Sequence, residues 1–316
     1  MRSLGPIFAL LHTIARLSWR EFSVHWSTVA GLVALGALYE WRARIHTARA
    51  ATAEESAGPT RAQRASFMTG LMLLFLSLNG PLHDLSDFYL FSAHMVQHLL
   101  LTLIVPPLLI YGTPGWMLRP ALRVRWVAAI AGAVTGPRIA FVIFNVVLAA
   151  WHLPPLYNTA MAFHWVHITE HLMFLVAATL MWWPFLSPLP ELPRLPYPGQ
   201  MLYCILMTIP MSIVAIYIAL ASEVLYPAYA SAPRLWGITP LADQQLGGLI
   251  MWIPGGLFFT VVLSVIFFKW SQADGRSTDQ PSGLSMPIIS PSPLLPARSV
   301  RPSSDGLRPV HANDQP

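Results

Sequence analysis

Long, uniformly apolar runs separated by short polar stretches dominate the amino-acid sequence. Seven of them approach the roughly 20 residues that a helix needs to cross a bilayer. They cover residues 22–41, 66–80, 90–111, 138–157, 164–185, 200–222 and 246–270. Lipid offers the backbone no hydrogen-bond partner, and the runs lack the alternation of barrel strands, so each is predicted to be a helix. The pattern therefore predicts an all-α polytopic membrane protein with seven transmembrane helices.

Two clusters of helix-breaking residues fall at the ends of these runs. Asn79, Gly80 and Pro81 interrupt the second run at one end. Pro106 and Pro107 interrupt the third run near its other end. Because proline lacks the backbone N–H and clashes with the preceding turn, we expect a break at the first cluster and a kink at the second.

Composition supports a membrane protein and excludes several other classes. The 316 residues are 55% hydrophobic and only 10% charged, against about 25% charged in soluble domains. The high aromatic content argues against a disordered chain, and the single cysteine, Cys204, cannot form a disulfide within the chain. The net charge of +5 is spread thinly between apolar runs, so no nucleic-acid partner is expected.

The distribution of basic residues predicts the orientation. Fifteen of the 19 lysines and arginines fall on the side that holds the first, third and fifth connections and the C-terminus. By the positive-inside rule the N-terminus lies outside and the C-terminus in the cytoplasm.

The two ends of the chain differ from the apolar region. Residues 1–21 carry apolar positions at helical spacing, but Arg16 and Arg20 occupy the place of a signal-peptide cleavage site. This segment is predicted to be an interfacial helix. Residues 22–270 form the transmembrane domain, and residues 271–316, rich in proline and serine, are predicted to be a disordered cytoplasmic tail.

Histidines concentrate at the predicted outer leaflet. Of eleven histidines, seven fall at this level: His83, His94, His98, His152, His164, His167 and His171. His94 and His98 are spaced i, i+4, and the three from 164 to 171 are spaced i, i+3, i+7, so each set shares one helix face. His12 and His25 are interpreted as ordinary interfacial residues.

Such a cluster predicts a metal site, because a trigonal or tetrahedral centre needs three or four converging donors. Glu170 lies beside His171 and could ligate the ion or orient a histidine. Asp243 enters the last run at the same level. Imidazole suits copper, zinc, iron and nickel alike. Met95 and Met251 lie at a depth that permits a transient copper contact, although apolar packing is their expected role.

Other functions remain open on the residues alone. A membrane haem protein that transfers electrons could use a pair such as His98 and His171 as axial ligands. A copper importer would need ligands along the inner half, which offers little beyond Cys204 and Met207. A metal-dependent hydrolase would have Glu170 as its only candidate base within a run. The sequence contains no GxSxG, HExxH or phosphate-binding glycine motif.

Five strings in the chain resemble the CtaG-type caa3 cytochrome c oxidase assembly factors. They are HMVQHLLL at 94–101, PPLLIYGTP at 106–114, WHLPPLY at 151–157, HITEH at 167–171 and DQQLGGLIMW at 243–252. The resemblance runs from about the first apolar run to the seventh and leaves out the tail. It implies a seven-helix, non-enzymatic protein of the bacterial cytoplasmic membrane.

The resemblance also implies a client, a haem–copper cytochrome c oxidase whose subunits would be the partners. The site is carried over to His94, His98, His152, His167 and His171, and to Asp243. Our hypothesis is that copper enters from the outer face, where a soluble copper donor is a further candidate partner. Histidines of the third and fifth runs would hold it and pass it to the oxidase by ligand exchange.

Overall fold

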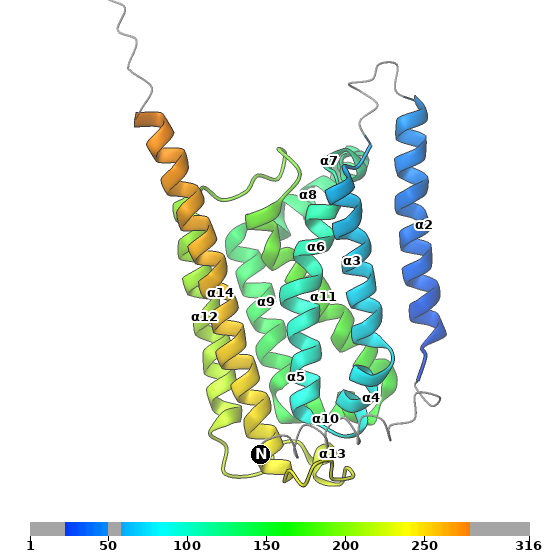
Figure 1. Cartoon of the computed structure of the whole chain (residues 1–316), viewed down its shortest axis with the longest axis vertical. Coiled ribbons are helices and arrows are strands. Elements are labelled where there is room, and N and C mark those ends of the chain that lie inside the picture. The colour runs from blue at the N-terminus through cyan, green and yellow to red at the C-terminus, as the bar shows by residue number, and fades with distance from the viewer. Residues whose placement is uncertain (1–22, 50–57, 279–316) are drawn as a thin grey trace, which may run out of the picture. The chain divides into compact units, whose positions relative to one another are not determined.

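The computed structural model describes residues 23–49 and 58–278, and the regular structure in these ranges is entirely helical. The helices are α2 (Trp26–Arg49), α3 (Arg61–Leu78), α4 (Pro81–Phe88), α5 (Phe91–Leu99), α6 (Val105–Gly112), α7 (Gly115–Leu118), α8 (Arg125–Val134), α9 (Pro137–His152), α10 (Pro154–Ala162), α11 (His164–Leu186), α12 (Tyr197–Ala219), α13 (Pro227–Ala230) and α14 (Pro240–Thr278). A π-helical turn, η1 (Leu100–Ile104), joins α5 to α6, and a 3-10 turn, η2 (Arg119–Arg123), follows α7. The long helices run side by side in a bundle (Figure 1).

Five stretches of the described chain are long and apolar enough to cross a membrane. They are Arg61–Phe88, Phe91–Gly112, His164–Leu186, Tyr197–Ala219 and Pro240–Asp274. The pair α8 and α9 bends by 72° and gives a sixth crossing if the two helices form one span. The all-helical membrane architecture is thus confirmed with five or six candidate spans, and the count of seven stays a prediction.

The first predicted span corresponds to α2, which does not meet the same hydropathy criterion. Its 24 residues are about 36 Å long, enough to cross a bilayer core. However, Glu40, Arg42 and Arg44 stand in its second half and reduce its apolar character. Length therefore permits a crossing, while composition makes α2 the least apolar of the long helices.

Two predicted boundaries are wrong. The run 138–157 does not continue as one helix, because α9 ends at His152 and α10 begins at Pro154, where the proline cannot donate the next hydrogen bond. The last helix is longer than 246–270: α14 extends from Pro240 to Thr278, so the first eight residues assigned to the tail are helical. The predicted interfacial segment 1–21 and residues 279–316 lie outside the described ranges.

The two predicted breaks are confirmed, and the second has a specific form. Pro106 cannot donate a hydrogen bond to the carbonyl of Thr102, and the helix widens just before it into the π turn η1. The freed Thr102 carbonyl instead accepts a hydrogen bond from the indole Nε1 of Trp182 on α11, at 2.9 Å. This hydrogen bond links the third predicted span to the fifth.

Close backbone approach holds α14 against α12. A Cβ atom on Gly248 would lie 2.6 Å from the backbone nitrogen of Ala219 and 2.9 Å from the carbonyl oxygen of Ala215. Only glycine fits this crossing, as is common where membrane helices pack closely. The buried core on the inner side of these helices includes Phe174 of α11 and Phe259 of α14.

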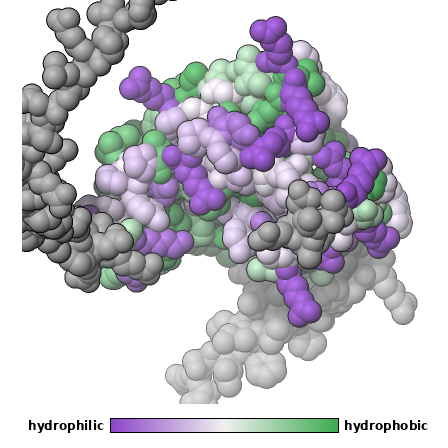
Figure 2. All heavy atoms as spheres, turned by 90° about the horizontal axis from the view of Figure 1, so that it is seen from above, coloured by the Kyte–Doolittle hydropathy of each residue, from purple (hydrophilic) through white to green (hydrophobic). Residues whose placement is uncertain are grey.

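Polar chemistry differs between the two ends of the bundle. The short helices α4, α10 and α13 lie at one end, and α7 and α8 lie at the other (Figure 1). Figure 2 looks onto the second end, where hydrophilic residues gather. Arg119, Arg123 and Arg125 belong to this end, while the histidine-bearing helix termini lie at the first.

Candidate metal centre

Helix termini bring most of the predicted site residues together at the end that carries α4, α10 and α13. His83 comes from α4, His94 and His98 from α5, and His152 from the last position of α9. Helix α11 supplies His164, His167, Glu170 and His171 along one edge. The predicted helical spacing is therefore realised, and facing helices α5 and α11 present their histidines to each other.

Three of these histidines form a first donor group. His94, His98 and His171 each offer a ring nitrogen, and these atoms lie within 4.8 Å of one another. All three side chains are buried. Glu170 lies next to them, with its Oε1 3.6 Å from Nε2 of His98 and 3.9 Å from Nε2 of His94.

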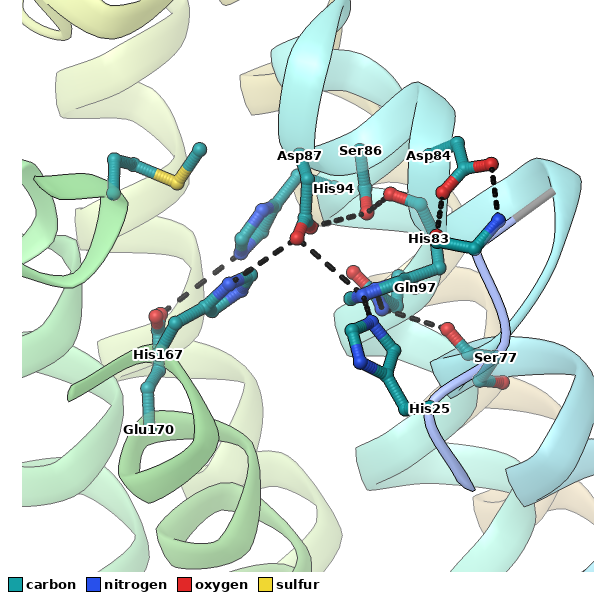
Figure 3. A network of polar contacts seen from close by, with 12 residues as sticks. His25, Ser77, His83, Asp84, Ser86, Asp87, His94, Gln97, His167 and Glu170 are labelled. Atoms are coloured by element: carbon teal, nitrogen blue, oxygen red, sulfur yellow. Dashed lines mark hydrogen bonds and ion pairs between the residues drawn. The ribbon is translucent and has the colours of Figure 1, made fainter. Parts of the chain in front are cut away.

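A second donor group shares His94 with the first. Asp87, His94 and His167 also offer ligand atoms within 4.8 Å of one another. Oδ2 of Asp87 lies 3.5 Å from Nδ1 of His167 and 3.4 Å from Nε2 of His83 (Figure 3). Asp87 therefore orients two imidazoles, as a carboxylate does around many metal sites.

A tyrosine fixes which nitrogen of His94 is free. Burial raises the pKa of the Tyr229 hydroxyl well above its ordinary value, so the phenol keeps its proton. It donates that proton to the carbonyl of Ser86 at 2.6 Å, and its oxygen is then an acceptor for Nδ1–H of His94 at 3.2 Å. With its proton on Nδ1, His94 presents a bare Nε2, the form that binds a metal.

His152 is prepared in the same way. Its Nδ1 donates to the carbonyl of Leu148 at 2.7 Å, which leaves Nε2 with a lone pair. This Nε2 is buried and has no hydrogen-bond partner.

Buried polar atoms without partners gather around this centre. They are Nδ1 of His98, Nε2 of His152, Nε2 of His167, Nε2 of His171 and both carboxylate oxygens of Glu170. Such atoms are rare in folded proteins, and each costs about 1–3 kcal/mol unless something satisfies it. Asp87 and Glu170 form ion pairs with histidines alone among the described residues, 23–49 and 58–278. Imidazole nitrogens and carboxylates left in this state fit a cation.

The distances also fit, after a small shift. Nε2 of His94 and Nε2 of His98 lie 2.8 Å apart. Two nitrogens bound tetrahedrally at 2.0–2.1 Å from an ion stand about 3.3 Å apart. The two rings would need to separate by about half an ångström to share one ion, which the adjacent turns of one helix allow.

Other predicted residues have different surroundings. His83 accepts from the amide of Gln97 at Nδ1, and its Nε2 lies 2.8 Å from Nε2 of His25, so both nitrogens have partners. His164 is exposed and stacks on His25 at 5.3 Å between ring centroids.

Asp243 lies at the end of a neighbouring helix. It accepts hydrogen bonds from the backbone N–H groups of Phe91 and Ser92 and from the Ser92 hydroxyl. Both of its oxygens thus satisfy the first turn of α5, the helix that carries His94 and His98.

A cavity opens beside the histidines. Its volume is about 200 Å³, and His25, His83, His164, His167 and His171 line it together with apolar side chains of α3, η1 and α11. Ser27 and Thr28 at the start of α2 complete its wall. The cavity thus reaches His167, a member of the second donor group.

Several residues of this centre are not among the predicted ligands. His25 was interpreted as interfacial but contacts His83, and Asp87 was not selected although it stands four residues after His83 on one helix face. That spacing was a usable signal. Tyr229 and Gln97 had none, because their partners His94 and His83 are 135 and 14 residues away in the chain and no helical spacing relates them.

Comparison with known protein families identifies the family of this chain. The family model described as "Cytochrome c oxidase caa3 assembly factor" matches residues 37–273, which is most of the chain. The chain belongs to the caa3 cytochrome c oxidase assembly factor family. The matched range contains every predicted ligand of the candidate metal centre.

Individual relatives are mycobacterial and longer. The chain is 28% identical over 204 residues to uncharacterized proteins of Mycobacterium bovis and Mycobacterium tuberculosis, covering 59% of this chain and 31% of theirs. An uncharacterized protein of Mycobacterium leprae is 24% identical over 228 residues, covering 67% of this chain and 34% of its own. The chain thus spans about a third of the length of these relatives. No solved structure matches it.

Proposed function

We propose that this membrane protein binds a copper ion as cargo at the His94 centre and assists metallation of a haem–copper cytochrome c oxidase. The observation that carries the proposal is the set of buried imidazole and carboxylate atoms without partners around His94, His98 and His171. Family membership supplies the client class, because the family is described as an oxidase assembly factor.

The chain's own residues support loading, holding and release. The cavity lined by His25, His83 and His164 admits the ion, and the half-buried His25 and the exposed His164 offer it contacts on the way in. His94, His98 and His171 then hold the ion, with Glu170 balancing its charge. Because His94 belongs to both donor groups, the ion can pass from one to the other by exchanging one ligand at a time.

This proposal also fits better than haem binding. The rings of His98 and His171 stand 5.7 Å apart, but His94 lies 4.2 Å from the first ring and 5.9 Å from the second. A porphyrin plane between these two histidines would collide with His94. The role we propose is a carrier's, without catalysis, with the oxidase subunits and a copper donor on the outer face as partners.

The experiment compares metal content in the full-length protein purified in detergent. Wild type, the double variant His94→Ala/His98→Ala and the control His46→Ala are loaded with copper, desalted and analysed by mass spectrometry. His46 stacks on Trp116 near the opposite end of α2, at 3.9 Å between ring centroids, so its loss removes an imidazole without touching the centre.

We expect copper in the wild type and in His46→Ala, and a loss of at least tenfold in the double variant. Equal copper in all three proteins would contradict the proposal. An optical spectrum of bound haem in the purified wild type would contradict it as well.

A further inference from the structure

A second, smaller cavity lies deeper in the bundle. Its volume is about 20 Å³, and α5, α9, α11, α12 and α14 enclose it. His98, His152, Met95, Met211 and Met251 are among its lining residues. A void needs about 10–15 Å³ to hold one water molecule, so this cavity has room for one small occupant.

Two imidazole nitrogens at this cavity lack partners. Nδ1 of His98 and Nε2 of His152 are both buried without a hydrogen bond. The Leu148 carbonyl accepts a hydrogen bond from Nδ1–H of His152, so Nε2 carries the lone pair that can bind a metal. The two rings lie 5.8 Å apart and meet edge to face.

Three thioethers from three helices complete the lining. Met95 belongs to α5, Met211 to α12 and Met251 to α14, and each side chain is buried. Methionine fills apolar cores well, but packing alone leaves the buried nitrogens of His98 and His152, which both line this cavity, without a partner. A water molecule could donate to imidazole nitrogens but would gain little from the sulfurs, since thioether sulfur is a weak acceptor.

We propose that this cavity is a second metal site, specific for a soft monovalent cation such as Cu(I). Its donors are the imidazoles of His98 and His152 and the thioether sulfurs of Met95, Met211 and Met251. Thioether and imidazole ligands together select soft cations over hard ones. The site goes beyond the proposed function, because it has sulfur donors and would use Nδ1 of His98, whereas the His94 centre would use Nε2 of the same ring, so a neutral His98 would serve one site at a time.

The test uses silver(I), a soft cation that does not change oxidation state under the conditions of binding. Silver is bound to the full-length protein in detergent, and X-ray absorption at the silver edge reports the ligand atoms. The site variant is Met95→Leu/Met211→Leu/Met251→Leu. The control is Met207→Leu, one turn before Met211 on α12, which is buried but does not line the cavity. Leucine nearly conserves the volume of methionine, and size-exclusion profiles check the fold.

We expect sulfur scattering in the wild type and in Met207→Leu. In the triple variant we expect the sulfur scattering to disappear and about one equivalent of bound silver to be lost relative to the wild type. Absence of sulfur scattering from the wild type would overturn the inference, as would an unchanged spectrum in a folded triple variant.

A further variant separates this inference from the proposed function. His94→Ala/His167→Ala disrupts both donor groups of the first centre and leaves the lining of the small cavity intact. Silver bound through sulfur in this variant supports a separate second site, even if the first centre binds no copper. Loss of the sulfur signal in the folded variant would contradict a separate site.

Discussion

His94 belongs to both donor groups, and the groups around it determine its protonation. The Tyr229 hydroxyl donates a hydrogen bond to the Ser86 carbonyl, so its oxygen accepts one from Nδ1–H of His94. Tyr157 adds a further hydrogen bond to the same oxygen, at 2.9 Å. One hydroxyl therefore connects the loop before α14 to the ligand of the centre.

Replacing Tyr229 by phenylalanine should weaken metal binding without removing a ligand. His94 would lose the acceptor for its Nδ1 proton, and its ring would be free to change tautomer and orientation. Loss of such a partner weakens metal affinity by about 10- to 100-fold. Copper titration of detergent-purified protein measures the effect, with Tyr217→Phe, on the exposed side of α12, as the control. Equal affinity in wild type and Tyr229→Phe would show that the hydroxyl does not orient His94.

Replacing Asp243 by asparagine should lower stability more than metal stoichiometry. The carboxylate accepts from two backbone N–H groups and one hydroxyl at the start of α5, and an amide can accept through one oxygen alone. A lost cap bond costs about 1 kcal/mol, and a buried unpaired donor costs more.

Thermal unfolding in detergent measures this change, with the exposed Glu223→Gln as control. We expect the folded fraction of Asp243→Asn to bind as much copper as the wild type. A folded variant that lacks copper would instead identify Asp243 as a ligand, as the sequence suggested.

At the scale of single residues, the sequence predicts the candidate metal ligands better than it predicts the hydrogen-bond partners of those ligands. The i, i+4 and i, i+3, i+7 spacings found His94, His98, His167 and His171 because helical periodicity is local. The same reasoning could not distinguish His83, whose nitrogens both have partners, from His152, whose Nε2 has none. That distinction depends on contacts between segments far apart in the chain.

At the scale of elements, the π turn η1 joins the histidine-bearing half of its span to the proline-containing half. Pro106 frees the Thr102 carbonyl, and Trp182 of α11 satisfies it. The two helices that carry the histidines are therefore linked by a hydrogen bond one to two turns below the centre. The prolines predict a kink, but no sequence pattern indicates which side chain occupies the freed carbonyl.

Replacing Trp182 by phenylalanine should destabilise the protein, since the Thr102 carbonyl would lose its partner in a buried setting. The expected cost is about 1–3 kcal/mol. The matched control is Trp183→Phe on the same helix, because the indole nitrogen of Trp183 has no hydrogen-bond partner. Unfolding temperatures of the two variants should differ clearly. Similar values would mean that lost aromatic volume, and not the hydrogen bond, sets the effect.

At the scale of the whole molecule, the number of crossings determines where the termini lie. The described helices give five or six candidate spans, and α2 would add one more. An odd number places the N- and C-termini on opposite sides of the membrane, and an even number places them on the same side.

Reporter fusions at each end test this arrangement. We expect an N-terminal reporter to be active outside the cytoplasm and a C-terminal reporter inside it, as the arginine distribution predicts. Both reporters on the cytoplasmic side would indicate an even number of crossings, in which either α2 or the bent pair α8 and α9 does not span the membrane. A fusion at the Arg119–Arg123 turn, expected inside, provides the internal reference.

The partnerless atoms around His94 have a consequence for the empty protein. Because burial leaves these nitrogens and carboxylates without hydrogen bonds, the metal-free state is the less stable one. Cargo at about 100 times its dissociation constant would stabilise the fold by about 2.7 kcal/mol, which a rise in melting temperature on copper addition would reveal. Under the proposed function, release of copper would return the protein to this less stable form, so a protease that cleaves partly unfolded membrane proteins would degrade metal-free molecules before copper-bound ones.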